Sequence, residues 1–189
     1  MLRTGSALAT VAFMVSACSS PFSASESSGG FVSGDGSITV VDAGDREPLT
    51  AISGQTLEGE QLSTEQFDGK ALVLNVWGEW CAECRLEAAD LQEASVRLGD
   101  DAQFIGIDIR DQLTQARQFQ EQKGITYPSI FDPDSSTLLQ MPADLYPVAV
   151  PTTYVVDPEG LVAARILGPT TASTLTGLVE DVLAEQEPP

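Results

Sequence analysis

The sequence contains no histidine among its 189 residues. Serine and cysteine hydrolases use an imidazole to take the proton from their nucleophile, so this absence excludes Ser–His–Asp and Cys–His catalysis. Zinc and haem sites that depend on histidine ligands are excluded for the same reason. The absence therefore removes much of the common hydrolase and metal-site chemistry.

Basic residues are also scarce: 9 lysines and arginines stand against 28 aspartates and glutamates, for a net charge of −19. A nucleic-acid-binding protein needs a cationic face to meet the phosphates, so we expect no nucleic-acid partner. The acidic residues are spread along the chain, which is typical of a well-solvated surface rather than an acidic interaction tail. The 42% of apolar residues is enough for a normal core.

The N-terminus has a short apolar segment that is too short to cross a bilayer, which takes ~20 residues. Arg3 supplies a positive charge, residues 7–15 supply the apolar segment, and the small residues Ser16 and Ala17 follow. This arrangement predicts a secretory signal peptide over residues 1–17.

The signal segment ends in VSAC, residues 15–18, which resembles the bacterial lipobox. In a lipobox the cysteine becomes the lipidated first residue of the mature protein. Lipidation would also remove an odd thiol that is a liability in an oxidising compartment. The resemblance implies that Cys18 anchors the chain to the outer face of the bacterial cell membrane. Ordinary cleavage after Ala17, which leaves Cys18 as a plain thiol, is the alternative.

Serine and glycine dominate residues 19–37, where few apolar residues are available to bury. We therefore expect residues 18–45 to form the lipidated N-terminus and a flexible tether. One domain is expected over residues 46–189.

Several segments of the domain have the pattern of β-strands. Short apolar runs cut by glycines over residues 48–70 indicate a small N-terminal hairpin. The continuous apolar run at 71–77 is typical of a strand that is buried on both faces of a sheet. Further extended segments are expected at residues 103–109, 127–132, 151–157 and 161–168.

Helices are expected between these strands. Apolar residues recur at helical spacing over residues 82–98 and 170–186. Asp111 is expected to cap a further helix that ends near Lys123. The alternation of strands and helices predicts an α/β domain in which a central mixed sheet has helices on both faces.

Cys81 and Cys84 stand three residues apart, between the strand at 71–77 and the helix at 82–98. Open α/β sheets place their ligand crevice at the carboxyl ends of the strands. The free N–H groups and the positive dipole end of a helix N-terminus stabilise a thiolate there and lower the pKa of the thiol. A thiol of low pKa beside a second thiol indicates thiol–disulfide exchange.

A metal site and a purely structural disulfide are the other interpretations of the pair. A structural zinc site needs four ligands, and with Cys18 acylated only two thiolates and no histidine remain. A disulfide that closes so small a loop would contribute little to stability. We therefore favour a redox role and expect neither a metal nor an organic cofactor.

The segment LNVWGEWCAECRLE, residues 74–87, resembles the active-site segment of the thioredoxin-like superfamily. The resemblance is to its TlpA/ResA-like branch of extracytoplasmic thiol–disulfide oxidoreductases. SGQTLEGEQLSTEQFDGKALVLNVW resembles the N-terminal hairpin and lead-in strand of that branch, and VPTTYVVDPEGLV resembles its proline loop and final strands. The resemblance spans about residues 50–185. It implies a thioredoxin-like fold with an extra N-terminal β-hairpin.

The resemblance also implies roles for individual residues. Cys81 would be the attacking thiol that forms a mixed disulfide with the substrate, and Cys84 the buried resolving thiol. Trp80 would pack beside the pair and shield it. Glu87 would lie near the cysteines and help to move protons, with a raised pKa if it is half buried. A solvated helix glutamate is the alternative for Glu87.

Pro151 matches the proline that this branch holds in the cis form, facing the disulfide. The backbone of Val150 would then pair with an extended segment of the substrate, as in a short β-augmentation.

The chain departs from many members of the branch between the cysteines, where Glu83 takes the place of a proline. Glu79 adds another carboxylate close by. We hypothesise that these two charges modestly oppose the Cys81 thiolate, because one unit of pKa is only ~1.4 kcal/mol. Opposing the thiolate favours the disulfide form and makes the centre a reductant.

Together these features predict a membrane-anchored, extracytoplasmic thiol–disulfide oxidoreductase that exchanges disulfides with exported proteins. Apocytochrome c is a client by family analogy only, and electrons would come from a membrane-embedded thiol carrier. Two alternatives stay open. One is a peroxiredoxin-type thiol peroxidase, and the other is a non-catalytic thioredoxin-fold lipoprotein that serves as a binding module.

Overall fold

The computed structural model describes residues 31–33 and 38–186. The signal peptide predicted over residues 1–17 and the predicted lipidation of Cys18 lie outside these residues. No helix in the described ranges is long and apolar enough to cross a membrane.

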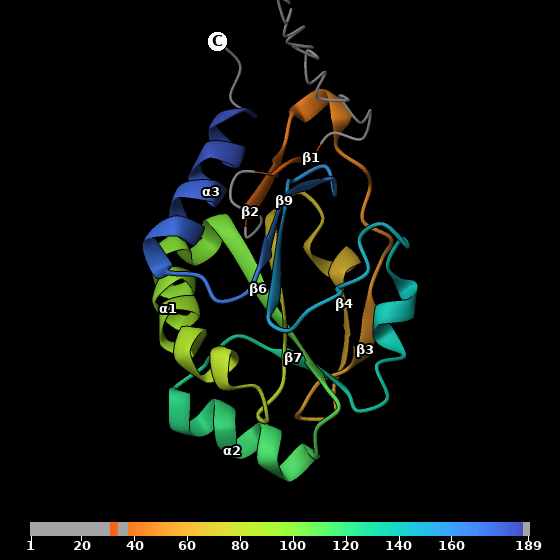
Figure 1. The fold of residues 1–189 in the computed structure, drawn as a ribbon, viewed down its shortest axis with the longest axis vertical. Coiled ribbons are helices and arrows are strands. Elements are labelled where there is room, and N and C mark those ends of the chain that lie inside the picture. The colour runs from red at the N-terminus through yellow and green to blue at the C-terminus, as the bar shows by residue number, and fades with distance from the viewer. Residues whose placement is uncertain (1–30, 34–37, 187–189) are drawn as a thin grey trace, which may run out of the picture.

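A seven-stranded mixed sheet runs through the centre of the molecule (Figure 1). Its strands are β1 (Phe31–Ser33), β2 (Ile38–Val41), β5 (Ala71–Trp77), β6 (Ala102–Ile109), β7 (Ser129–Asp132), β8 (Thr152–Val156) and β9 (Val162–Leu167). The spatial order is β1-β2-β9-β8-β5-β6-β7. Strands β5, β6 and β7 are parallel, whereas β8, β9, β2 and β1 pair antiparallel. All residues of β5 are buried, which explains its continuous apolar run.

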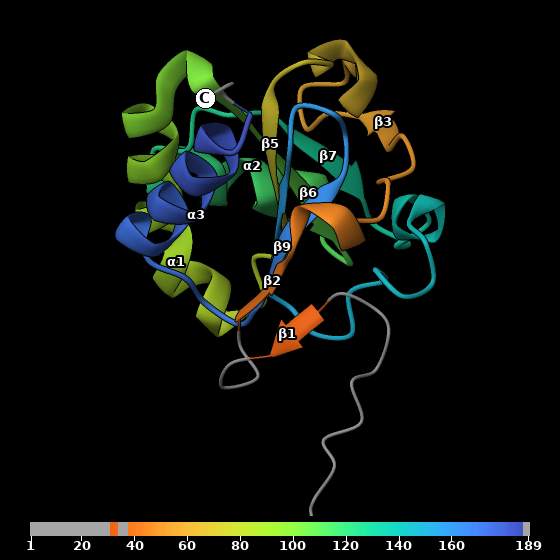
Figure 2. The same ribbon diagram turned by 90° about the horizontal axis from the view of Figure 1, so that it is seen from above.

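Three α-helices pack on one face of this sheet within the described chain. They are α1 (Ala82–Leu98), α2 (Leu113–Lys123) and α3 (Ala172–Ala184). Helices α1 and α3 share a buried cluster with Val73 of β5, and Phe119 of α2 stacks on Trp77. Side chains alternate along a strand, so Val73 and Trp77 point to the same face. Figure 2 shows α1 and α3 side by side on one side of the strands.

A β-hairpin and short 3-10 helices cover the opposite face. The hairpin pairs β3 (Ser53–Gln55) with β4 (Gln61–Ser63), as predicted. Of the 3-10 helices in the described residues, η2 (Thr64–Phe67) and η4 (Thr137–Gln140) pack on this face, whereas η3 (Gly99–Asp101) continues α1 and η1 (Ala43–Asp45) follows β2. Leu62 of β4 and Leu138 of η4 pack in one core cluster with Leu74 of β5.

Helices thus flank both faces, but only one face carries α-helices. The crossovers β5–α1–β6 and β6–α2–β7 step in the same direction across the sheet. Parallel crossovers are right-handed, so both helices must lie on the same side.

The predicted tether is wrong at its C-terminal end. Strand β2 pairs with β9, with Ile38 opposite Ile166, and β1 pairs with β2, so both belong to the sheet. The run ITVV at 38–41 has the β-branched residues that suit a strand. Its last residue, Val41, is buried.

A buried cation ties the N-terminal segment to the rest of the domain. Arg46 donates through Nη1 to Asp157, at the end of β8, at 3.1 Å, and through Nη2 to Glu185, just after α3. The guanidinium and the Asp157 carboxylate are both only 2% exposed. A buried ion pair of this kind fixes where the chain enters the domain.

The predicted cap of α2 is wrong by one residue. Gln112 occupies the N-cap position and its side chain makes no capping hydrogen bond. The carboxylate of Asp111 instead accepts hydrogen bonds from the backbone N–H groups of Gln112 and Glu79, each at 2.7 Å. It therefore braces the loop that carries the cysteine pair.

The approach of β6 to β7 yields a stability prediction. A Cβ on Gly106 would lie 2.1 Å from Ser129 Oγ and 2.6 Å from Trp77 Nε1, two atoms that are hydrogen-bonded to each other. We expect Gly106→Ala to lower the free energy of unfolding by about 1–3 kcal/mol, measured by urea denaturation. Gly177→Ala is the control: it meets nothing within 4 Å and, in helix α3, should raise stability by about 1 kcal/mol. A Gly106→Ala protein as stable as its parent would contradict this packing.

Candidate active site

Cys81 and Cys84 form a disulfide at the start of α1, with their Cα atoms 5.3 Å apart. Cys81 is the N-cap residue, and its sulfur accepts a hydrogen bond from the N–H of Cys84 at 3.1 Å. The two residues are 6% and 2% exposed, so Cys81 is the more accessible. In the reduced state, the same N–H and the helix dipole would stabilise a thiolate on Cys81.

A loop from the far end of the chain faces the disulfide. The carbonyl oxygen of Val150 lies 3.7 Å from Cys81 Sγ, and the Val150–Pro151 peptide bond is cis, the form expected of this proline. The hydroxyl of Thr152 donates to the carbonyl of Ala149 at 2.7 Å, which braces the loop. The structure thus brings Val150 and Pro151 to the cysteine pair, although Val150 follows Cys81 by 69 residues in the sequence.

Two tryptophans lie near the pair in different environments. Trp77 is buried in one cluster with both cysteines, although its sequence pattern indicates only the end of a strand. Trp80, which was expected to shield the site, is 44% exposed at the surface. Its Nε1 donates to the carbonyl of Ile109 at 3.0 Å, and the guanidinium of Arg110 lies 4.7 Å from its ring centroid.

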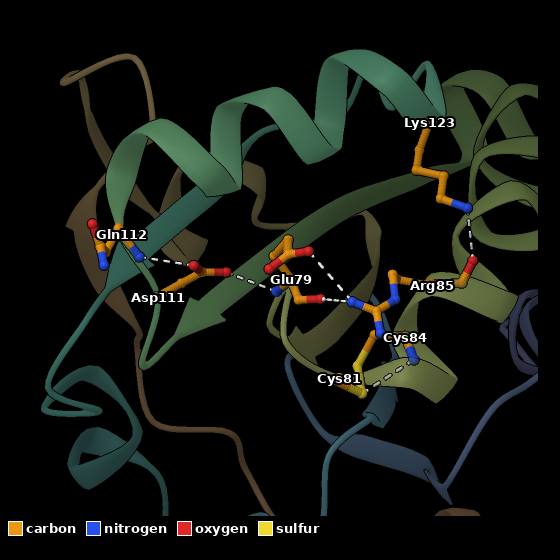
Figure 3. A network of polar contacts seen from close by, with 7 residues as sticks. All are labelled: Glu79, Cys81, Cys84, Arg85, Asp111, Gln112 and Lys123. Carbon is orange, nitrogen blue, oxygen red and sulfur yellow. Dashed lines mark hydrogen bonds and ion pairs between the residues drawn. A yellow bond between two sulfur atoms is a disulfide. The ribbon is translucent and has the colours of Figure 1, made fainter.

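A polar network surrounds the loop before Cys81 (Figure 3). The carboxylate of Glu79 pairs with Arg85 Nη1 at 3.3 Å, and the same nitrogen donates to the Glu79 carbonyl at 2.7 Å. Lys123 donates to the carbonyl of Arg85 at 2.9 Å. Both members of the Glu79–Arg85 pair are partly exposed, so the pair adds little stability. Its effect is to offset the charge of Glu79, whereas Glu83 is exposed on the first turn of α1.

Glu87 is buried, only 2% exposed, on the inner side of α1. Its Oε1 accepts from Asn75 Nδ2 at 2.9 Å, and its Oε2 accepts from the N–H of Thr170 at 3.1 Å. Burial raises the pKa of Glu87 to about 7, although these two hydrogen bonds oppose the rise. The alternative of a solvated helix glutamate is therefore wrong, and the carboxyl can carry or release a proton near neutral pH.

Asp108 is a second buried carboxyl at this edge of the sheet and was not predicted as a site residue. It lies on β6 in register with Trp77 and is fully buried. Neither carboxylate oxygen has a hydrogen-bond partner among the described residues. Burial, followed by the nearby Asp111 and Asp132, raises the pKa of Asp108 to about 8. The only signal in the sequence was an acidic residue inside an apolar strand.

Potential metal ligands do not gather in the part of the chain that the structure describes. No group of three or more histidine, cysteine, aspartate or glutamate side chains there could hold a metal ion.

The sheet, the helix that begins at a cysteine pair and the facing proline loop define a thiol–disulfide oxidoreductase with a thioredoxin-like fold. The AhpC/TSA family matches residues 46–165, more than half of the chain, so the chain belongs to that family. The predicted membership of the thioredoxin-like superfamily is thereby confirmed.

Relatives and solved structures agree with this assignment. The thiol:disulfide interchange protein HelX of Rhodobacter capsulatus is 31% identical over 144 residues, 75% of this chain and 77% of HelX. A DsbF homologue from Corynebacterium diphtheriae is 38% identical, with a TM-score of 0.72 over 79% of this chain and 96% of that one. A secreted thiol-disulfide isomerase from Corynebacterium glutamicum is 33% identical, with a TM-score of 0.70 over the same shares.

The burial of the Glu87 carboxyl leads us to predict how the free energy of unfolding depends on pH. Its pKa rises from 4.5 to about 7 on folding, so the folded protein binds a proton that the unfolded chain has lost. The free energy of unfolding therefore falls as pH rises from about 4.5 to about 7, by about 3 kcal/mol for this group, and is constant above. In Glu87→Gln this loss should disappear, measured as the difference between urea-unfolding profiles of variant and parent.

Glu93→Gln is the control for this measurement, because Glu93 is an exposed glutamate of the same helix. Because Glu87 is intact in this variant, its free energy of unfolding should fall between pH 4.5 and 7 as it does in the parent. The same fall in Glu87→Gln would contradict the assigned pKa of Glu87.

Proposed function

We propose that this chain is an extracytoplasmic enzyme, anchored to the membrane through Cys18, that reduces or exchanges disulfides in exported proteins. The observation that carries the proposal is the position of the Cys81 sulfur. It lies between the N–H of Cys84, in the first turn of α1, and the carbonyl of Val150. The helix supplies activation of the thiol, and the loop supplies a backbone edge for a client segment.

The names of the relatives support the choice of substrate and compartment. HelX is a thiol:disulfide interchange protein, and the isomerase from Corynebacterium glutamicum is secreted. The signal segment and VSAC sequence, residues 1–18, agree with export and anchoring. Apocytochrome c as client and a membrane thiol carrier as electron donor stay predictions.

In the reducing direction, the Cys81 thiolate attacks one sulfur of the client disulfide and forms a mixed disulfide, while the other client sulfur leaves as a thiolate. The Cys84 thiol then gives up its proton and attacks Cys81 Sγ. This step releases the second client thiolate and forms the Cys81–Cys84 disulfide. Two electrons pass from protein to client, and the released client thiolates take up protons.

Glu87 is suited to receive the proton of Cys84. It lies one helical turn beyond Cys84 and is buried, with a pKa near neutrality. A carboxyl of this pKa can accept a proton in one step and return it in the next.

The resolving step gives a test of the mechanism. Cys81→Ser should abolish insulin reduction in a dithiothreitol-coupled turbidity assay, because no attacking thiol remains. Cys84→Ser should lose turnover yet accumulate a mixed disulfide with the client through Cys81, visible by mass spectrometry. A wild-type protein without turnover and without an iodoacetamide-reactive thiol after reduction would instead indicate a binding module. Peroxide consumption that exceeds insulin reduction would favour the peroxidase.

The direction of electron flow gives a second test. Because Arg85 offsets Glu79, Glu83 is the carboxylate left to oppose the thiolate. We expect Glu83→Gln to lower the pKa of the Cys81 thiol by about half a unit and to make the reduction potential less negative. The pH dependence of iodoacetamide alkylation and a glutathione redox titration measure the two quantities. Glu93→Gln, further along α1, should change neither; equal values for Glu83→Gln and wild type would refute this role.

A further inference from the structure

An open pocket of about 670 Å³ adjoins the disulfide. Its lining includes Trp80, Arg110 and the segment 146–150. Because Val150 also touches Cys81 Sγ, a client segment in this pocket would reach the reactive sulfur.

Apolar side chains that are exposed to solvent gather in the pocket. Seven large hydrophobic side chains are exposed in the described chain, and three of them line this pocket: Trp80, Tyr146 and Val148, which are 44%, 37% and 80% exposed. Exposed apolar groups that gather in one place mark a surface that another molecule covers.

Unusual backbone conformations also occur at this pocket. Among the described residues, only Arg110 and Ser135 combine a side chain with a positive φ, at 53° and 60°. Both line the pocket. L-residues adopt this conformation at a cost, and such outliers concentrate at ligand sites, where the surrounding structure holds them.

The positive charge of Arg110 is also not neutralised by an ion pair among the described residues. Its guanidinium lies over the Trp80 ring. The neighbouring carboxylates are engaged elsewhere: Asp111 accepts from Glu79 and Gln112, and Asp132 accepts from Ser136 and Thr137. A third neighbour, Asp108, has a pKa raised to about 8 and is uncharged at neutral pH.

Resting on the proposed function, we propose that this pocket is the client-binding site and that Arg110, held over Trp80, selects extended client segments with a carboxylate near the reactive cysteine. A planar guanidinium stacked on an aromatic ring presents its donors in a fork that fits a carboxylate. The apolar walls receive the client's neighbouring apolar side chains. On a chain of net charge −19, an acidic client is repelled elsewhere and attracted here, which fixes its register.

The test uses disulfide-containing peptides in which a glutamate is placed, one position at a time, within three residues on either side of the cysteine. Each has a glutamine twin. The second-order rate constant for oxidation of the reduced protein is measured by stopped-flow tryptophan fluorescence. At the best position we expect the wild-type protein to prefer glutamate by about threefold to tenfold, from the strength of a partly exposed charged hydrogen bond. The preference should shrink in 1 M salt.

Arg110→Gln should abolish the preference, whereas Lys70→Gln, which removes an exposed positive charge elsewhere, should keep it. Arg110→Asn adds a readout of folding. Asparagine tolerates positive φ better than arginine, so this variant should lose the preference with no fall in its urea midpoint. Equal rates for glutamate and glutamine peptides at every position in wild type, or a preference that survives Arg110→Gln, would overturn the selectivity while the oxidoreductase stands. A protein that reduces none of the peptides overturns both proposals.

Discussion

The structure depends on one placement: the sulfur of Cys81 at the N-cap of α1. The N–H of Cys84 points at that sulfur, and the Val150 carbonyl faces it from the other side. The placement requires β5 to be buried along its whole length and to end at Trp77, so that the chain can turn within four residues into a helix. The loop in between is held by Asp111, which accepts the N–H of Glu79.

Two buried carboxyls give the site its electrostatic character. Glu87 is hydrogen-bonded and has a pKa of about 7, whereas burial and the nearby Asp111 raise the pKa of Asp108 to about 8. At neutral pH the Glu87 carboxyl is therefore about half protonated and the Asp108 carboxyl is largely protonated, although the chain as a whole is strongly acidic. The negative charge of the protein therefore lies mainly on its surface, and Arg110 stands exposed beside the disulfide with the pocket open next to it.

Much of the architecture could be predicted from local patterns. The continuous apolar run of β5, the helix period of α1 and the cysteine pair between them were sufficient to place the site. The hairpin β3–β4 and the cis form of Pro151 came from resemblance to a known family. Strand β2 was missed because four suitable residues follow a long Ser/Gly-rich segment, whose composition dominated the prediction.

Other features depend on contacts that no local pattern encodes. Arg46 meets Asp157 from 111 residues away, and Asp108 becomes exceptional only because folding buries it beside the carboxylates of Asp111 and Asp132. The α-helices share one face because of the strand order, which the sequence did not reveal. Arg85 illustrates the same limit at short range: it follows Cys84 directly, yet only the folded loop shows that it offsets Glu79.

The central claim is that the helix N-terminus activates Cys81. The most direct measurement is the pKa of the Cys81 thiol, from thiolate absorbance against pH. It is made on the reduced Cys84→Ser variant, in which Cys81 is the thiol of the pair that remains. We predict a value clearly below the ~8.5 of a free cysteine. A value at or above ~8.5 would contradict it, because the thiolate would then gain nothing from its position at the start of α1.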